Sequence, residues 1–135
     1  MANEMTANVN RSLKVGALTI GGTVQNVLHD GVVNFSKTIP AGTNAEIDIS
    51  VDVSTVLAMA IEGDNDCDIY TNAVSSGSYD DHLVLKAKQP LIWATGDPAS
   101  LQFFTTDVTK LYVTCAAPTL LKFGAALDST PVLTP

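Results

Sequence analysis

Three aspartates at alternate positions, Asp64, Asp66 and Asp68, carry the sharpest chemical signal in this sequence. Glu62 stands just before them. Hard cations such as calcium bind several carboxylate and carbonyl oxygens at close range, so this run is a candidate calcium site. The EF-hand pattern is not met, because Ile69 stands where that loop needs glycine and no glutamate closes the loop. We favour a turn between two strands whose acidic side chains face solvent, with calcium as the alternative.

A second polar cluster, Tyr79, Asp80, Asp81 and His82, precedes a predicted strand. Paired carboxylates can perform acid–base catalysis when both reach one substrate. Adjacent residues on a strand point to opposite faces, so these two carboxylates are not expected to converge. The sequence also lacks a G-x-S-x-G nucleophile motif. We therefore predict no catalytic residues, no cofactor and no enzymatic activity.

The two cysteines, Cys67 and Cys115, fall at strand positions that share a face with apolar residues. Free cysteine behaves as a small hydrophobic residue, which favours two buried thiols over a disulfide. Neither C-x-x-C nor H-x-x-x-H spacing is present, so a zinc site is not predicted.

The single tryptophan, Trp93, follows Leu91 at strand parity, which favours a place in the core. The alternative is a carbohydrate-binding or fibre module, in which an exposed Trp93 or Tyr79 stacks on a sugar ring. The two interpretations differ in whether these rings are exposed.

Composition limits the possible partners. The chain has 135 residues, which corresponds to one domain, and 46% of them are hydrophobic but only 16% charged. Its formal charge is −7, and its seven cations are scattered along the chain, whereas phosphate binding needs clustered lysine and arginine. We therefore expect no binding to nucleic acid or to an anionic membrane. No apolar run is long enough to span a bilayer, and the polar start MANEMTANVN does not resemble a secretion signal.

The elements that must position these residues are strands. The segment AEIDISVDV at residues 45–53 alternates polar and apolar side chains, and this period of two is typical of a half-buried strand. Weaker versions recur along the chain, separated by turns rich in glycine, proline, asparagine and aspartate. The sequence predicts an all-β fold of about eight to ten short strands, a mostly antiparallel β-sandwich, jelly-roll-like or immunoglobulin-like.

Three segments bear on how these strands are arranged. Residues 11–20 are predicted to form the first strand, with Leu13, Val15 and Ala17 on one side. Residues 56–63, VLAMAIEG, are apolar on both faces and predict a central, fully covered strand. Residues 101–109 are compatible with a short strand or with a loop.

Several segments together resemble small β-sandwich structural proteins of tailed bacteriophages, in particular capsid decoration (cement) proteins. The resemblance spans most of the chain and is carried by MANEMTANVN, TIPAGTNAEIDISVDV, LVLKAKQPLIW, FTTDVTKLYVT and LLKFGAALDSTP. It implies a virion protein made in the bacterial cytoplasm, which assembles as a homo-oligomer, often a trimer, and binds the major capsid protein. It implies no catalytic residues. Another phage role, at the head–tail junction, in the tail or in the capsid shell, is the alternative.

The expected domain organisation is a polar arm at residues 1–10, one β-sandwich domain at 11–127 and a tail at 128–135. The arm and the tail are the segments expected to bridge neighbouring subunits. The residues predicted to make these protein contacts are Ala2, Asn3, Asn8, Asn10, Asp128, Pro131 and Leu133.

Overall fold

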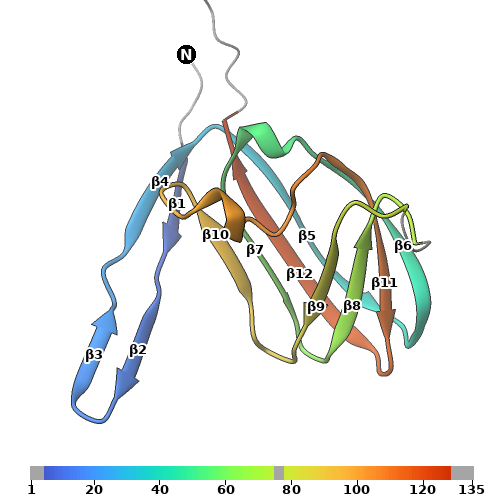
Figure 1. The fold of residues 1–135 in the computed structure, drawn as a ribbon, viewed down its shortest axis with the longest axis horizontal. Helices are drawn as coiled ribbons and strands as arrows, with labels where there is room; N and C mark the ends of the chain where they lie inside the picture. The colour runs from blue at the N-terminus through green and yellow to red at the C-terminus, as the bar shows by residue number, and fades with distance from the viewer. Residues whose placement is uncertain (1–4, 75–77, 129–135) are drawn as a thin grey trace, which may run out of the picture.

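The chain folds as a β-sandwich, which confirms the predicted all-β class. The structure is a computed structural model, and it describes residues 5–74 and 78–128. Two four-stranded antiparallel sheets face each other, and a long two-stranded ribbon leaves the sandwich on one side (Figure 1). The first sheet has the order β10 (Leu91–Ala94), β7 (Val56–Gly63), β12 (Thr119–Leu127) and β5 (Gly31–Ile39). The second has the order β6 (Gly42–Val51), β11 (Val108–Cys115), β8 (Cys67–Thr71) and β9 (His82–Leu85).

The core lies between the two sheets and is built by alternation along the strands. In β6, Ile47 and Val51 are buried, while Glu46 and Asp48 on either side of Ile47 remain exposed, as the alternation of residues 45–53 predicts. β6 is an edge strand of its sheet, and charged side chains on an edge oppose unwanted pairing with another chain. Lys110 of the neighbouring strand β11 reaches both carboxylates, with its Nζ 3.2 Å from Glu46 and 3.8 Å from Asp48.

The ribbon consists of two paired segments. Its base pairs β1 (Met5–Val9) with β4 (Gln25–His29), and its tip pairs β2 (Ser12–Val15) with β3 (Leu18–Gly21). Half of the segment expected to be a polar arm is thus the strand β1. The segment 11–20, predicted to be one strand, is instead a hairpin, because Gly16 has a φ of 60° and forms a two-residue turn with Ala17. These two differences raise the strand number to twelve in the described residues, above the predicted eight to ten.

Two short 3₁₀ turns complete the described fold. The turn η1 (Val53–Thr55) is capped by Asp52, whose carboxylate accepts hydrogen bonds from the backbone N–H and the hydroxyl of Ser54. The turn η2 (Ala99–Leu101) opens the segment for which the sequence allows strand or loop, and no strand begins there before β11. Phe104 in this segment is fully buried, so the loop closes one end of the core. In the described part of the chain, no helix is long and apolar enough to cross a membrane.

Candidate functional site: a projecting apolar hairpin

The structure does not bring the candidate calcium ligands together. Asp64 accepts a hydrogen bond from the backbone N–H of Leu120 at 2.7 Å, and Asp66 accepts one from that of Ala87 at 2.7 Å. Asp68 lies 3.2 Å from a ring nitrogen of a histidine in β9. Within residues 5–74 and 78–128, no group of three or more His, Cys, Asp or Glu side chains is placed to hold a metal ion. Asp64 and Asp66 instead connect the β7–β8 turn to β12 and to Ala87, and Asp68 of β8 contacts the neighbouring strand β9.

Asp80 and Asp81 also serve separate structural contacts. Asp80 accepts a hydrogen bond from Nδ2 of Asn72 at 2.6 Å, whereas Asp81 accepts from both the backbone N–H and the hydroxyl of Thr105, at 2.8 and 2.7 Å. The two carboxylates therefore face different partners, as their adjacent positions predict. Their geometry fits loop fixation and offers no shared acid–base site.

Neither of the two aromatic residues named as candidates for sugar stacking, Trp93 and Tyr79, is fully exposed. Trp93 is 9% exposed and lies in the core, as predicted, with Nε1 donating a hydrogen bond to the carbonyl of Pro98 at 3.1 Å. Tyr70 and His82 stack on each other, with ring centroids 4.3 Å apart. Tyr79 is half-buried and approaches Tyr70 edge-on at 4.9 Å. Tyr70, Tyr79 and His82 therefore form one cluster of packed rings.

Cys67 and Cys115 lie opposite each other on β8 and β11, and both are buried and unbonded. Burial raises the pKa of the Cys67 thiol to about 11, with smaller contributions from the neighbouring Cys115 and from Asp68 and Asp66. A thiol with such a pKa is protonated at neutral pH and is a poor nucleophile. The pair therefore acts as part of the core.

The predicted contact residues fall into two groups. Asn8 lies in β1 and Asn10 directly follows it, and both are exposed. Asp128 is exposed at the end of β12, where its backbone N–H donates to the carbonyl of Thr55 at 2.8 Å. The other predicted contact residues, which lie outside the described residues, are Ala2, Asn3, Pro131 and Leu133.

The base of the ribbon is packed onto the outer face of the first sheet. Its buried residue Val27, flanked by Ala7 and Val9, forms a small second core with alanines of the sheet. These alanines are Ala58 of β7, Ala94 of β10 and Ala126 of β12. Small side chains allow a second layer of backbone to approach closely, so β1 and β4 can lie over this face.

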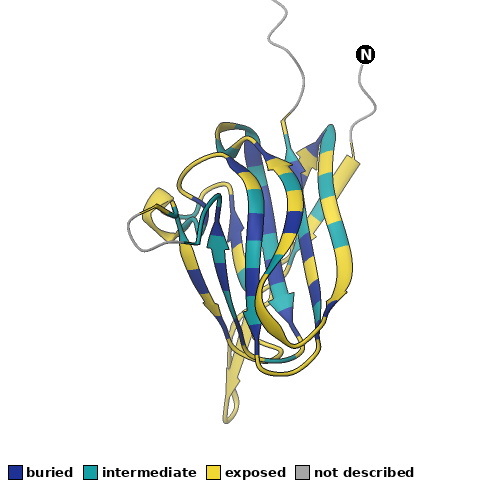
Figure 2. Cartoon of the chain, turned by 90° about the vertical axis from the view of Figure 1, so that its right-hand side faces the viewer, coloured by how far each residue is buried: buried dark blue, intermediate teal, exposed yellow. Residues whose placement is uncertain are grey.

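The tip of the ribbon, hairpin β2–β3, presents four large apolar side chains that the described chain leaves exposed. Leu13 pairs with Ile20 and Val15 with Leu18, so all four side chains share one face. Their exposed fractions are 59% for Leu13, 59% for Val15, 62% for Leu18 and 55% for Ile20. The hairpin extends past the end of the sandwich and is exposed along its whole length (Figure 2).

Three features fix the direction of this hairpin. At the junction with the base, Gly21 has a φ of 81°, and a side chain there would collide with the backbone oxygen of Arg11. The chain can bend at this point because glycine adopts positive φ without strain. The Arg11 guanidinium binds both carboxylate oxygens of Asp97, at 3.1 and 2.6 Å, and this hydrogen bonding lowers the pKa of Asp97. Gln25 adds a hydrogen bond of 2.8 Å to the carbonyl of Thr95.

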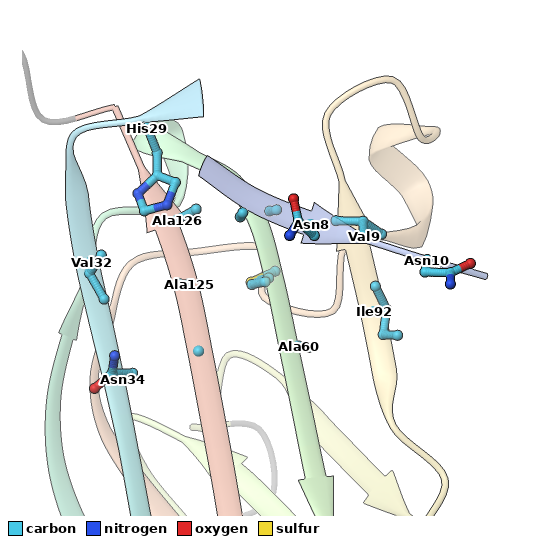
Figure 3. A pocket seen from close by; sticks show the side chains of 14 residues that line it. Asn8, Val9, Asn10, His29, Val32, Asn34, Ala60, Ile92, Ala125 and Ala126 are labelled. Carbon is cyan, nitrogen blue, oxygen red and sulfur yellow. The ribbon is translucent and has the colours of Figure 1, made fainter. Parts of the chain in front are cut away.

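A shallow groove of about 540 Å³ runs over the outer face of the first sheet beside the ribbon base. Its floor includes Ala60 of β7 and Gly124 of β12, which are register partners. Ile92 of β10 and Val32 of β5 flank this floor, and Asn10 lies at the edge (Figure 3). The groove is mainly apolar and open to solvent, and it holds no cluster of catalytic side chains.

Comparison with protein-family models, curated proteins and solved structures finds no match to this chain. The candidate site is therefore defined by its geometry alone. It consists of an exposed apolar hairpin held outward by Arg11 and Gly21, next to an apolar groove on the sheet. Sequence reasoning missed it, although the segment LKVGALTI contains the signal: apolar residues at alternate positions on both sides of a glycine turn.

Proposed function

We propose that this chain is a non-enzymatic structural protein of a tailed-bacteriophage virion, specifically a decoration protein that binds the capsid exterior as a homo-oligomer. The observation that carries the assembly role is the apolar face of hairpin β2–β3. Isolated exposed apolar residues are common on soluble proteins, but a contiguous apolar patch on a projecting element is typical of an interaction site.

The surroundings of the hairpin support a role in assembly. The bidentate contact between Arg11 and Asp97 and the glycine bend hold the hairpin away from the sandwich, so its apolar face is presented rather than folded back. The polar residues that could have supported catalysis are engaged in structural hydrogen bonds. Decoration proteins act by contact area rather than by chemistry, and this arrangement fits such a role.

The assignment to a phage capsid rests on the resemblance of five segments, from MANEMTANVN to LLKFGAALDSTP, to decoration proteins. Under this proposal, the partners are copies of the chain itself and the major capsid protein, and the protein resides in the virion after synthesis in the bacterial cytoplasm. A stable contact needs on the order of 1,000 Å² of buried surface. Binding through several copies of an oligomer would raise the avidity beyond that of one contact.

Co-sedimentation with capsids tests this proposal. Purified chain would be mixed with empty capsids of the encoding phage and, separately, with its isolated tails. The proposal predicts saturable sedimentation with capsids and none with tails. Sedimentation with tails alone would favour the alternative virion role, and sedimentation with neither would refute the proposal.

Truncated chains would locate the capsid contact. Removal of residues 129–135 or of residues 1–4 is preferable to removal of 1–10, because β1 begins at Met5 and covers Val27. Weaker capsid binding by either truncated chain would support the predicted bridging role of the arm or the tail. Unchanged binding by both would restrict the capsid contact to residues 5–128.

A further inference from the structure

The ribbon base covers only part of the outer face of the first sheet, and the groove is the part that it leaves uncovered. The sequence of β7 predicts coverage on both faces, yet the ribbon base covers this strand only around Leu57 and Ala58, while Ala60 is half-buried in the groove. The groove continues toward a smaller hollow of about 260 Å³ bounded by Glu62 and Lys122. The outer face of β7 and β12 is therefore uncovered and apolar at Ala60 and Gly124, and the charged pair Glu62 and Lys122 bounds this stretch.

Gly124 marks the middle of this uncovered stretch. It lies in β12, which is hydrogen-bonded to a strand on each side, a position where glycine weakens a sheet. Its φ is not positive, and a Cβ built on it meets no atom within 4 Å. Neither the backbone conformation nor the packing inside one copy requires glycine here. Glycine in a strand interior also occurs where another backbone or a ligand approaches closely, and the open space above Gly124 fits that use.

The hairpin has the chemistry to fill this groove. The face that carries Leu13, Val15, Leu18 and Ile20 is apolar, as is the groove floor. The hairpin cannot be the occupant in its own copy, because all of its residues remain exposed and it extends past the sandwich (Figures 1 and 2). A second copy can offer its groove to it.

Charge favours a second copy as the partner. The ribbon, residues 5–29, holds Arg11 and Lys14 and no acidic residue, which gives it a formal charge of +2. The remainder of the chain holds five of the seven cations and all fourteen acidic residues, five minus fourteen, or −9. Arg11 is already paired with Asp97 of its own copy, so Lys14 on the hairpin is the ribbon cation that, among the described residues, remains for a contact with the acidic body of a second copy. Complementary charges steer association and favour contact of the ribbon with the body of another copy.

We propose that hairpin β2–β3 of one copy docks its apolar face onto the first-sheet groove of a second copy, over Ala60 and Gly124. The inference rests on the proposed assembly function and names the partner of the hairpin. A ten-residue hairpin alone buries less than the roughly 800 Å² per partner of a standard interface. Reciprocal exchange in a dimer, or head-to-tail exchange in a closed ring, gives each copy two such contacts and doubles the area that each copy buries.

Site-directed cross-linking tests the contact directly. One preparation carries Val15→Cys and another carries Ala60→Cys, and the two are mixed before treatment with a short bismaleimide. The proposal predicts a cross-linked dimer that contains one chain of each type. Val84→Cys replaces Val15→Cys in the control, because Val84 is also an exposed strand valine, at 54%. The native thiols Cys67 and Cys115 are buried. Any background cross-linking through them is measured with chains that carry no introduced cysteine. Equal cross-linking in the Val84→Cys control would overturn the proposal.

Filling the groove is the complementary experiment. Gly124→Leu places a side chain in the open space, whereas Thr38→Leu places one on exposed β5 outside the groove lining. Self-association is measured by sedimentation equilibrium of the purified chain without capsids, and folding by thermal unfolding. The proposal predicts at least tenfold weaker self-association for Gly124→Leu, with an unfolding temperature like that of Thr38→Leu. A monomeric wild-type chain, or unchanged association in folded Gly124→Leu, would overturn it.

The two proposals can fail separately. Loss of self-association in Gly124→Leu together with the predicted cross-link supports the inference whatever the result with capsids. Self-association without capsid binding would refute the decoration role and leave the hairpin–groove contact in place. Capsid binding by a chain that is monomeric in solution and does not cross-link would refute the contact alone.

Discussion

Replacement of two apolar side chains of the hairpin should weaken assembly without weakening the fold. The test variant is Val15→Ser/Leu18→Ser, which removes one cross-strand pair from the tip. The matched control is Val84→Ser/Leu101→Ser, because these residues are also one valine and one leucine that are exposed elsewhere on the chain. The exposed fractions are 59% and 62% in the hairpin pair and 54% and 67% in the control pair, so the two pairs have the same total.

The expected magnitude follows from these fractions. Full burial of a valine or leucine side chain contributes about 2 kcal/mol, in proportion to the area removed from water. In the free chain, each hairpin residue has buried only about two-fifths of its surface, so either double variant should lower the free energy of unfolding by less than about 2 kcal/mol. Burial of the exposed remainder in an interface would contribute about 2.4 kcal/mol per hairpin, or roughly 50-fold in dissociation constant. Reciprocal exchange would double the free energy, to about 5 kcal/mol, or more than 10³-fold.

Sedimentation equilibrium and thermal unfolding of the three proteins provide the assay. We expect similar unfolding temperatures for the two variants and a loss of self-association only in Val15→Ser/Leu18→Ser. A dissociation constant that changes by less than about fivefold, or equally in both variants, would show that the hairpin is not the interface. If the sandwich unfolds in Val15→Ser/Leu18→Ser, these two side chains stabilise the core of their own copy, and the expectation that the variant weakens only assembly is wrong.

Three further outcomes are expected from the described contacts. The Cys67 and Cys115 thiols should not react with Ellman's reagent at pH 8 until the chain is unfolded, because both are buried and the pKa of Cys67 is raised to about 11; immediate reaction in the native protein would contradict this. Arg11→Ala should lower the unfolding temperature slightly near neutral pH. This difference should shrink as the pH falls below about 4, because the lowered pKa of Asp97 makes the contact stabilising only while the carboxylate is ionised; a difference as large at pH 2 as at pH 7 would exclude that cause. Leu111→Ala should cost about 2–5 kcal/mol in urea unfolding, since Leu111 is 0% exposed in the core, and a cost below about 1 kcal/mol would contradict its placement.

The fold could be predicted from the sequence where one face of a strand is buried and the other is solvated. The alternation at residues 45–53 correctly predicts a half-buried strand with Ile47 buried, and the apolar run at 56–63 correctly predicts a central strand. Full coverage of the outer face of that strand, which the same run predicts, is not found. An apolar sequence shows that a face avoids water but does not say whether the cover belongs to the same chain, so the half-open position of Ala60 could not be foreseen.

The ribbon is where the sequence-based prediction was wrong, and the cause is physical. Alternation at residues 11–20 predicts one half-buried strand, but the turn at Gly16 folds the segment on itself and puts Leu13 and Leu18 on one face. A pattern of period two predicts which residues share a face. It does not predict whether a core lies beneath that face.

The prediction of functional residues met a similar ambiguity, because the spacing of side chains does not show what they contact. The alternate spacing of Asp64, Asp66 and Asp68 is compatible with convergence on an ion or with separate hydrogen bonds, and only the surrounding loops decide between these. The core position of Trp93, in contrast, could be predicted from its strand parity, because its apolar neighbours share its face.

The most direct test of the central claim is amide hydrogen exchange in the hairpin, residues 12–21. In dilute solution these amides should exchange rapidly, because, within residues 5–74 and 78–128, the hairpin is exposed along its length. At concentrations where the chain self-associates, we predict strong protection of residues 12–21 and of the β7 and β12 amides around Ala60 and Gly124. Hairpin amides that exchange equally fast in the dilute and the assembled states would contradict the account.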